Sequence, residues 1–309
     1  MTILALTGGV GGAKLSLGLT HVLDPSEVIF VVNVGDDFEH FGLSISPDID
    51  TLTYTLAGIV NESTGWGRED EAWDCLEELK RFEADTWFQL GDRDLALHLF
   101  RTGSIKRGRS LTEITEIICS RLGIKYRIVP VTDASLRTRV LTDQGSLAFQ
   151  DYFVRLQCNP KVSKLEYHQR TPASLSPAIK TDQISGIVIC PSNPFLSIDP
   201  ILEVDEMRAI LVEREFPVVA VSPIVGDRSI KGPTAKMMSE LGMQVTCTGV
   251  ARHYHEILDG YMIDNTDAHH TAEIEALGIR VRMAPSIMHT LDDKIQLASN
   301  CVDFLDELT

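Results

Sequence analysis

Short runs of apolar, often β-branched residues recur along the whole chain, and most are separated by stretches with helical periodicity. The runs occupy residues 2–6, 28–34, 127–131, 186–190, 218–222, 244–248, 261–264 and 279–283. Runs of this length that are apolar on both faces are typical of strands in a parallel sheet covered by helices on both sides. The pattern therefore predicts an α/β protein with a Rossmann-like, doubly wound, mainly parallel sheet.

Two regions interrupt this alternation. Residues 52–125 contain two amphipathic helical stretches without a strong strand between them, which predicts a helical elaboration. Residues 135–182 begin with an alternating pattern around a glycine-containing turn, which predicts a hairpin within a small inserted subdomain. The core is then expected at 1–134 and 183–309, and residues 292–308 are expected to close it as an amphipathic helix.

The net charge and the spacing of the cysteines limit the kinds of ligand and of binding site that are expected. The formal net charge of -16 disfavours binding to nucleic acid or to an anionic membrane on electrostatic grounds, so small-molecule ligands are expected. The basic stretch at 101–110 is interpreted either as a phosphate-binding segment or as solvated surface.

Six cysteines without a CxxC spacing indicate buried thiols rather than a zinc site or a disulfide framework. No apolar run is long enough to span a bilayer and no signal-peptide pattern is present, so a cytoplasmic protein is expected.

The segment TGGVGGAK follows the first apolar run and precedes a helical pattern. Its glycines permit positive φ and let backbone N–H groups approach an anion, and the following helix would add the positive end of its dipole. Neither a Walker loop nor a dinucleotide fingerprint is complete, because Ala13 precedes Lys14 and because Lys14 stands where the fingerprint needs glycine. The segment is interpreted either as a phosphate cradle or as a tight turn without a ligand.

Four aspartates follow the second run within residues 33–51, namely Asp36, Asp37, Asp48 and Asp50. Carboxylates gathered on loops beside a phosphate cradle are the ligands that Mg²⁺ prefers. The alternative is that each aspartate caps a helix or fills a turn. The density of the cluster favours a divalent metal.

Polar residues also follow later elements. Asp92 and Arg93 lie at an expected helix start, where the acid suits a cap and the arginine could bind a phosphate or a carboxylate. Ser192 and Asn193 follow a strongly apolar run and stand between two prolines. The prolines restrict the backbone, so these two polar side chains could bind the edge of a nucleobase. No Ser–His–Asp or Cys–His arrangement is recognisable, which disfavours covalent catalysis.

Seven segments can be read together in this order: TGGVGGAK, VVNVGDD, ISPDIDT, GWG, QLGDRDLALHL, PSNPFLSIDPIL and VSPIVG. On these segments the chain resembles, over nearly its whole length, the 2-phospho-L-lactate transferases of deazaflavin coenzyme biosynthesis (CofD), especially their bacterial phosphoenolpyruvate-type members (FbiA). The resemblance implies transfer of a phospholactyl or phosphoenolpyruvyl group from a guanosine diphosphate-linked donor to the ribityl hydroxyl of the deazaflavin Fo, with GMP leaving. It also implies Mg²⁺ as the cofactor and a homodimer.

The resemblance further implies roles for individual positions. Asp36 and Asp50 would bind Mg²⁺, and together with Arg93 they are the catalytic candidates. The donor would contact Gly9, Val10, Gly11, Gly12, Lys14, Ser192 and Asn193. Fo would contact Asp48, Asp50, Gln89, Asp92 and Arg93, with Asp50 also placed to orient or deprotonate its hydroxyl. Many bacterial relatives carry arginine at the position of Lys14. A phosphate contact from Lys14 would therefore lack the paired hydrogen bonds that a planar guanidinium group can make.

Two other functions remain open on the sequence alone. A nucleotide- or nucleotide-sugar-binding regulator related to the gluconeogenesis-factor-like proteins would need the glycine loop but not the aspartate cluster. An NAD-dependent dehydrogenase would need the complete fingerprint. For the transferase, the sequence does not distinguish a donor that carries lactate from one that carries enolpyruvate or glycerate.

Overall fold

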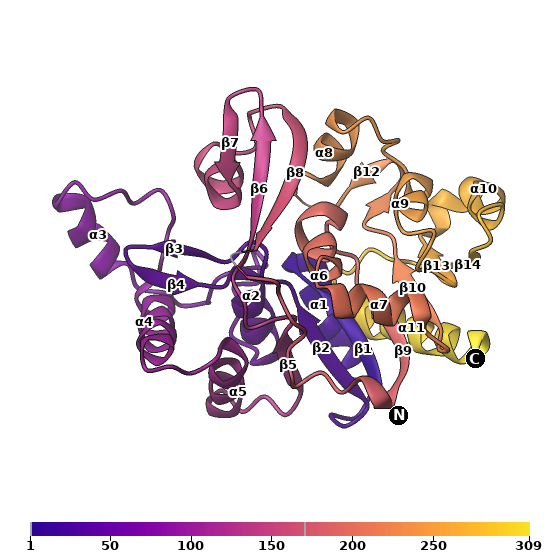
Figure 1. The fold of residues 1–309 in the computed structure, drawn as a ribbon, viewed down its shortest axis with the longest axis horizontal. Coiled ribbons are helices and arrows are strands. Elements are labelled where there is room, and N and C mark those ends of the chain that lie inside the picture. The colour runs from indigo at the N-terminus through magenta and orange to yellow at the C-terminus, as the bar shows by residue number, and fades with distance from the viewer. Residues whose placement is uncertain (1, 170, 231) are drawn as a thin grey trace.

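The computed structural model describes residues 2–169, 171–230 and 232–309, and its core is a seven-stranded sheet (Figure 1). The strand order is β14-β13-β10-β9-β1-β2-β5, and every neighbouring pair is parallel. The strands are β1 (Thr2–Thr7), β2 (Val28–Val32), β5 (Arg127–Pro130), β9 (Ile184–Ile189), β10 (Val218–Val221), β13 (Gly260–Ile263) and β14 (Arg280–Met283). The predicted α/β, doubly wound parallel sheet is confirmed.

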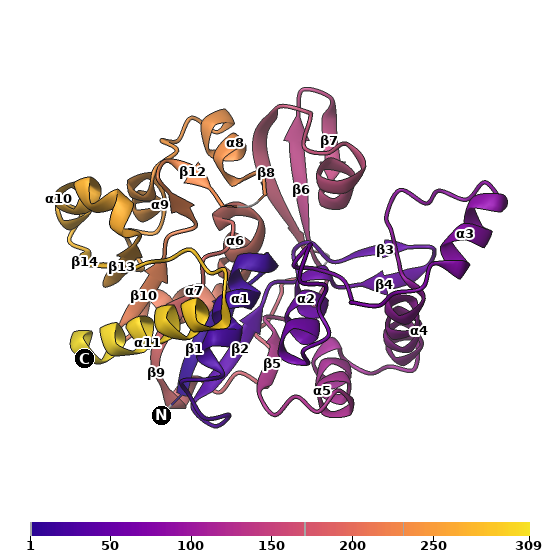
Figure 2. The same cartoon turned by 180° about the vertical axis from the view of Figure 1, so that it is seen from behind.

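Strand β1 lies between β2 and β9, so the direction in which strands are added reverses at β1. In open parallel sheets, ligands bind beyond the carboxyl ends of the strands at such a switch point. Helices cover both faces: α1 (Gly9–Leu19) and α11 (Leu291–Leu308) pack together on one face, and α7 (Asp205–Glu213) lies on the other (Figures 1 and 2). The predicted C-terminal helix is confirmed as α11.

One predicted strand is wrong. Residues 244–248 form no strand but lead into helix α9 (Cys247–His253). The Thr246 hydroxyl accepts a hydrogen bond from the Gly249 N–H at 3.0 Å, so it caps the helix. A β-branched residue that can cap a helix therefore outweighed the local preference for strand at this position.

The region between β2 and β5 contains a hairpin and four helices, on the left of Figure 1. These are β3 (Phe38–His40), β4 (Leu43–Ile45), α2 (Pro47–Leu56), α3 (Asp74–Arg81), α4 (Asp92–Lys106) and α5 (Leu111–Arg121). Both amphipathic stretches predicted from the sequence are helical, as α3 and α5. Helix α5 begins with a capping box formed by Ser110 and Glu113.

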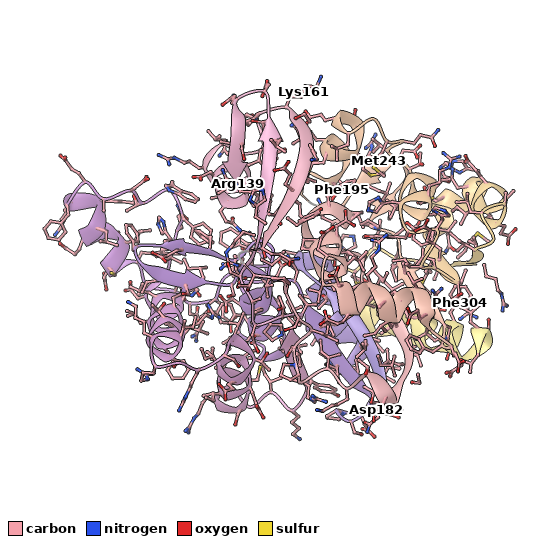
Figure 3. The ribbon with its side chains drawn as sticks, viewed as in Figure 1. Arg139, Lys161, Asp182, Phe195, Met243 and Phe304 are labelled. Atoms are coloured by element: carbon pink, nitrogen blue, oxygen red, sulfur yellow. The ribbon has the colours of Figure 1, made fainter. Side chains whose placement is uncertain are left out.

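A separate three-stranded antiparallel sheet, β7-β6-β8, stands at the top of Figure 1. Its strands are β6 (Leu136–Thr142), β7 (Gly145–Ala148) and β8 (Val162–Gln169), and a π-helix η1 (Asp151–Arg155) lies between β7 and β8. The predicted hairpin is thus confirmed as β6 and β7. The Tyr167 hydroxyl donates to the carbonyl of Phe195, labelled in Figure 3, at 2.7 Å, which ties β8 to the segment after β9.

The remaining elements follow β8. They are η2 (Thr181–Gln183), η3 (Pro194–Ile198), α6 (Asp199–Leu202), β11 (Ile224–Val225), β12 (Arg228–Ser229), α8 (Thr234–Glu240), η4 (Asn265–His270) and α10 (Thr271–Glu275). All six cysteines are free; four are buried, whereas Cys75 and Cys158 are half-buried, so the prediction of buried thiols is correct for four of them. Across the described ranges, no helix has both the length and the apolarity to cross a membrane.

Candidate active site

A cavity of about 910 Å³ opens beyond the carboxyl ends of β1 and β9. One part of its wall comes from the loops after these strands and from the first turn of α1. The other part comes from the β2–β5 region and from residues 149–157, which follow β7 and include η1. The predicted residues on the wall are Gly9, Val10, Gly11, Lys14, Asp36, Asp48, Asp50, Gln89, Ser192 and Asn193. The switch point of the sheet and the predicted site therefore coincide in space.

The glycine segment packs tightly against the loop after β9. A Cβ atom on Gly11 would lie 2.2 Å from the Pro191 carbonyl oxygen, and one on Gly12 would lie 2.7 Å from the Ser192 hydroxyl oxygen. The Gly8 N–H donates to that same hydroxyl at 3.3 Å. The N–H groups in the first turn of a helix have no acceptor within the helix, so Val10 and Gly11 present donors on the cavity wall. The segment is both a tight turn and a feasible anion site.

Asn33 connects two of the predicted aspartates. It is fully buried at the end of β2, and its amide nitrogen lies 3.1 Å from Asp36 Oδ1 and 2.9 Å from Asp48 Oδ2. Asp48 Oδ1 accepts from the Gly9 N–H at 2.7 Å, so this carboxylate lies against the N-terminus of α1. Asp36 and Asp48 therefore form an adjacent acidic pair. Sequence reasoning missed Asn33, although an asparagine directly after a buried strand was a usable signal.

The pKa values of three buried carboxyl groups after β2, those of Asp36, Asp37 and Asp48, are raised. Burial, with the nearby Asp48 and Asp37 carboxylates, raises the pKa of Asp36 well above its ordinary value. Burial also raises the pKa of Asp48 to about 6 and that of Asp37 to about 7. Negative charge here lacks full compensation from the protein, which favours a bound cation.

Asp37 makes the stability of the metal-free protein fall as pH rises. The folded state retains this proton up to about pH 7, whereas the unfolded chain releases it near its ordinary value of about 3.9. The folded state therefore loses stability through that window. We expect Asp37→Asn to reduce this loss by about 3 kcal/mol between pH 4 and pH 7. Denaturant unfolding of both proteins at the two pH values, with chelator present, measures it; equal pH dependence would contradict the assignment.

Asp50 lies in a different electrostatic environment. Both of its carboxylate oxygens accept from the guanidinium of Arg101, with Nη1 3.0 Å from Oδ2. The Arg101 side chain is 1% exposed, so this is a buried ion pair. The charge of Asp50 is therefore already balanced by the protein, in contrast to that of Asp36.

His98 and Asp94 extend this pair along one face of α4. Arg101 Nη1 lies 3.1 Å from His98 Nδ1, and because arginine can only donate, that nitrogen accepts. The His98 proton is then on Nε2, which lies 3.3 Å from Asp94 Oδ1. Asp94 in turn accepts a hydrogen bond from the Tyr54 hydroxyl. Nδ1 of His98 is therefore engaged by Arg101, whereas Nε2 is buried next to Asp94 without a hydrogen bond to the residues that the structure describes.

Aromatic side chains form much of the remaining wall: Trp66, Trp87, Phe88, Phe149 and Phe153. The rings of Trp87 and Phe88 meet edge to face with centroids 5.7 Å apart. Phe149 and Phe153 are stacked with centroids 5.3 Å apart. A wall of flat apolar faces beside charged groups suits a planar ligand with a polar tail. Sequence reasoning did not identify these residues.

Three predicted residues are not on the cavity wall: Gly12, Asp92 and Arg93. Gly12 is buried in the first turn of α1. Arg93 is exposed in the first turn of α4, where its backbone N–H donates to Glu71 at 2.9 Å. The Asp92 carboxylate accepts from the backbone N–H groups of Asp74 and Cys75 at 3.2 and 3.1 Å, so it caps α3. Their proposed roles toward a ligand stay predictions.

Other predicted residues have structural partners as well as a place on the wall. The Asn193 side-chain oxygen accepts from the N–H groups of Phe195 and Leu196 at 3.0 and 3.1 Å, so it caps η3. Lys14 Nζ donates to the Met288 carbonyl at 2.8 Å. The basic stretch at 101–110 is divided: Arg101 is buried, whereas residues 105–109 are exposed.

Arg101 is the most consequential residue that sequence reasoning missed. Asp94, His98 and Arg101 are spaced i, i+4 and i+7, so they share one face of a helix. That polar stripe was the available signal. Its partner Asp50 lies 51 positions earlier, and no local pattern pairs the two.

Known proteins match this chain over nearly its whole length. A family model described as 2-phospho-L-lactate transferase CofD matches residues 3–287. The chain is 37% identical to a phosphoenolpyruvate transferase of Streptomyces griseus, covering 100% of this chain and 99% of the relative. It is 35% identical to a 2-phospho-L-lactate transferase of Methanocaldococcus jannaschii, covering 99% of each chain.

The fold also matches a solved structure. A UPF0052 family protein from Bacillus halodurans superposes with a TM-score of 0.61 at 13% identity, covering 97% of this chain and 98% of that one. At this identity the match concerns the fold alone. The family model and the full-length relatives together show that the chain belongs to the 2-phospho-L-lactate transferase CofD family and is a transferase.

Proposed function

We propose that this enzyme moves a phospholactyl or phosphoenolpyruvyl group from a guanosine diphosphate-linked donor to the ribityl hydroxyl of Fo, and that GMP leaves. The observation that carries the proposal is one cavity that joins an anion-binding helix terminus, an acidic group and an aromatic wall. Relatives named phosphoenolpyruvate transferase and 2-phospho-L-lactate transferase support the two donor groups.

The donor diphosphate fits beside the first turn of α1. The N–H groups of Val10 and Gly11 and the ammonium of Lys14 line the cavity there. The helix dipole adds to their attraction for phosphate oxygens. Ser192 and Asn193, on the same part of the wall, would meet the nucleoside.

Fo fits the opposite part of the cavity. Its planar ring would stack on the aromatic wall, and its ribityl chain would extend toward Asp50. Each oxygen of that carboxylate retains a lone pair beyond its bond to Arg101, so Asp50 can accept a hydrogen bond from the attacking hydroxyl. Arg101 would hold the carboxylate in place during the reaction, and His98 would position Arg101.

The reaction is a substitution at phosphorus. The ribityl oxygen forms a bond to the phosphorus that carries the lactyl or enolpyruvyl group, and the bond from that phosphorus to the GMP oxygen breaks. The hydroxyl proton leaves toward Asp50 or solvent. Catalysis of this kind relies on positioning and on electrostatic stabilisation of phosphoryl oxygens, and needs no covalent intermediate.

The acidic pair of Asp36 and Asp48 is a suitable binding site for Mg²⁺. Its donors are hard carboxylate oxygens, and burial together with the nearby Asp48 and Asp37 carboxylates raises the pKa of Asp36, a cost that a bound cation would offset. Asp36 would hold the ion together with Asp48, and Asp50 would approach it only while keeping its pair with Arg101. When bound, the ion would neutralise charge on the transferred phosphoryl group.

Synthetic donors test this function directly. The purified enzyme would be incubated with Fo, Mg²⁺ and a guanosine diphosphate-linked donor that carries lactate, enolpyruvate or glycerate. We expect one donor to give a product with the mass of Fo plus the transferred group, with one GMP released per product. GMP release without a new Fo-linked mass would indicate donor hydrolysis and would contradict the proposal.

Removing one aromatic face should weaken Fo binding. We expect Trp87→Ala to raise the KM for Fo by about fivefold, because a stacking contact contributes about 1 kcal/mol, while kcat stays nearly unchanged. Trp73→Ala is the matched control, since Trp73 is 40% exposed and does not line the cavity. Steady-state kinetics over a range of Fo concentrations measures both; equal KM values in the two variants would exclude a stacking role for Trp87.

A further inference from the structure

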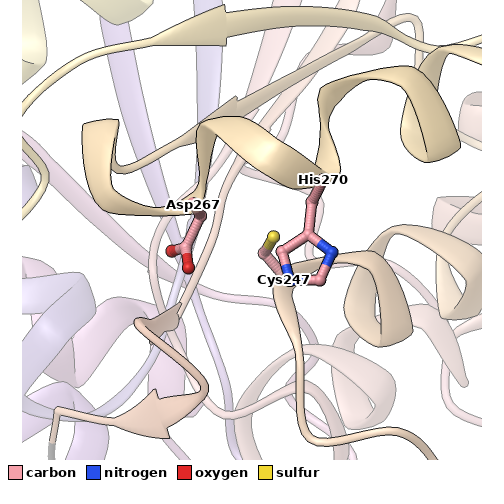
Figure 4. Close-up of side chains that lie close together, drawn as sticks. All are labelled: Cys247, Asp267 and His270. Carbon is pink, nitrogen blue, oxygen red and sulfur yellow. The ribbon is translucent and has the colours of Figure 1, made fainter.

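Three potential metal ligands meet outside the active-site cavity, on the C-terminal half of the sheet (Figure 4). Cys247 is the first residue of α9, and Asp267 and His270 belong to η4. One ligand atom from each lies within 4.8 Å of the others. A thiolate, an imidazole and a carboxylate together form a ligand set typical of zinc.

The His270 ring is oriented for coordination. Its Nε2 atom is buried and has no hydrogen-bond partner among the residues that the structure describes. The other nitrogen, Nδ1, lies 3.8 Å from Glu273 Oε2. A carboxylate behind a histidine is the usual outer partner of a metal-binding imidazole, where it fixes the tautomer that leaves Nε2 available.

A fourth ligand is within reach. Asp227 lies in the turn between β11 and β12, with a positive φ of 58° that follows Gly226. Its Oδ1 atom is 3.5 Å from His270 Nε2, and its side chain is 59% exposed. The site therefore has solvent access on the side where Asp227 or a water molecule would complete a tetrahedron.

The other two ligands are buried. Asp267 and Cys247 are both fully shielded from solvent. Burial, with the nearby Asp267 carboxylate, raises the pKa of the Cys247 thiol to about 12. The Gly226 N–H donates to Asp267 Oδ1 at 3.0 Å.

We propose that Cys247, Asp267 and His270 bind one divalent ion of the zinc type. Tetrahedral bonds of about 2.0–2.3 Å place ligand atoms about 3.3–3.8 Å apart, so the present separations need to contract by about 1 Å. Bonding replaces the thiol proton, which leaves to solvent, while no atom changes oxidation state. One Asp267 oxygen can bind the ion while the other keeps its bond to Gly226.

The ion would have a structural role. Asp267 holds the turn of the β11–β12 hairpin through Gly226, and the residues Pro223 and Ile230 that flank this hairpin lie on the active-site wall. Fixing the hairpin at its turn would therefore define one edge of the cavity. The site is independent of the proposed reaction, because it shares no ligand with the acidic pair of Asp36 and Asp48.

Cobalt(II) provides a direct test, because it substitutes for zinc and reports its ligands in its absorption spectrum. Chelator-treated, full-length protein would be titrated with cobalt(II). We expect one equivalent to bind with a thiolate-to-cobalt charge-transfer band in the near ultraviolet and with the visible bands of tetrahedral geometry. Zinc(II) should displace it at equimolar concentration. Absence of the thiolate band in the unaltered protein would overturn the proposal without recourse to any variant.

Matched variants then identify the ligands. We expect Cys247→Ala to abolish the thiolate band and His270→Gln to lower cobalt affinity by at least tenfold. Cys301→Ala removes another fully buried thiol, and His269→Gln removes the adjacent exposed histidine, so both should bind as the unaltered protein does. Glu273→Gln should weaken binding by about 10–100-fold while preserving the spectrum. A band that persists in Cys247→Ala, or is lost equally in Cys301→Ala, would refute the site.

Discussion

Asp50→Asn should lower the kcat of group transfer by on the order of 10³-fold, and it should also lower the free energy of unfolding by about 3–5 kcal/mol. The activity is lost because the amide cannot accept the hydroxyl proton and orients that group poorly. The stability is lost because Arg101, whose side chain is 1% exposed, would remain buried without its counter-ion. Single-turnover kinetics and denaturant unfolding measure the two effects separately.

A second variant separates the catalytic effect from the structural one. Replacing a buried ion pair by uncharged groups of similar volume is often neutral for stability. Asp50→Asn combined with Arg101→Met should therefore recover most of the lost stability and none of the activity. Asp205→Asn is the control for an acid away from the cavity, since Asp205 lies in the first turn of α7 and does not line the cavity. Undiminished turnover in Asp50→Asn would remove this residue from the mechanism.

The fold was largely predictable because its signal is periodic and repeated. Runs apolar on both faces predict buried parallel strands, and all five residues of β2 are indeed buried. The failure at 244–248 came from a cap: the same Thr246 that favours a strand by its branching also stabilises a helix start by its hydroxyl. Local propensity cannot decide between these outcomes without the tertiary contacts of α9.

The active-site cluster was predictable where its residues are close in sequence and follow strands. Asp36 and Asp48 come from one segment after β2, and both lie on the wall with the glycine segment. Partners from distant segments were not predictable. Of the two arginines in α4, sequence reasoning selected Arg93 because acids flank it. The two residues lie on different faces of the helix, so that Arg93 is exposed and Arg101 is buried beside Asp50.

The Cys247 group illustrates the same limit. Its members come from α9 and η4, with no ligand pair at a spacing typical of zinc motifs. A search for CxxC therefore excluded a zinc site that only the packing of these two elements brings together. Sequence spacing detects ligands within one element, whereas tertiary structure assembles ligands from several.

Asp36→Asn should lower Mg²⁺-dependent transfer by on the order of 10²–10³-fold, while raising the stability of the metal-free protein. The carboxylate is buried next to Asp48 and Asp37, and burial together with these acids holds its pKa well above the ordinary value. Ionising it in the absence of a cation therefore costs free energy, which the neutral amide avoids. The amide is also a poorer ligand for Mg²⁺, so binding of the ion should weaken.

Asp37→Asn is the matched control for this prediction. Asp37 is the adjacent buried acid, but its carboxylate accepts from the Ser46 hydroxyl at 2.8 Å and does not line the cavity. Calorimetric titration with Mg²⁺ and thermal unfolding with chelator should show higher metal-free stability in both variants, and weaker Mg²⁺ binding and slower transfer in Asp36→Asn. Equal losses of transfer in both would mean that only the total charge of the region matters. Because the same carboxylate destabilises the metal-free fold and is needed for metal binding, opposite changes in stability and activity would identify Asp36 as a ligand rather than as a structural residue.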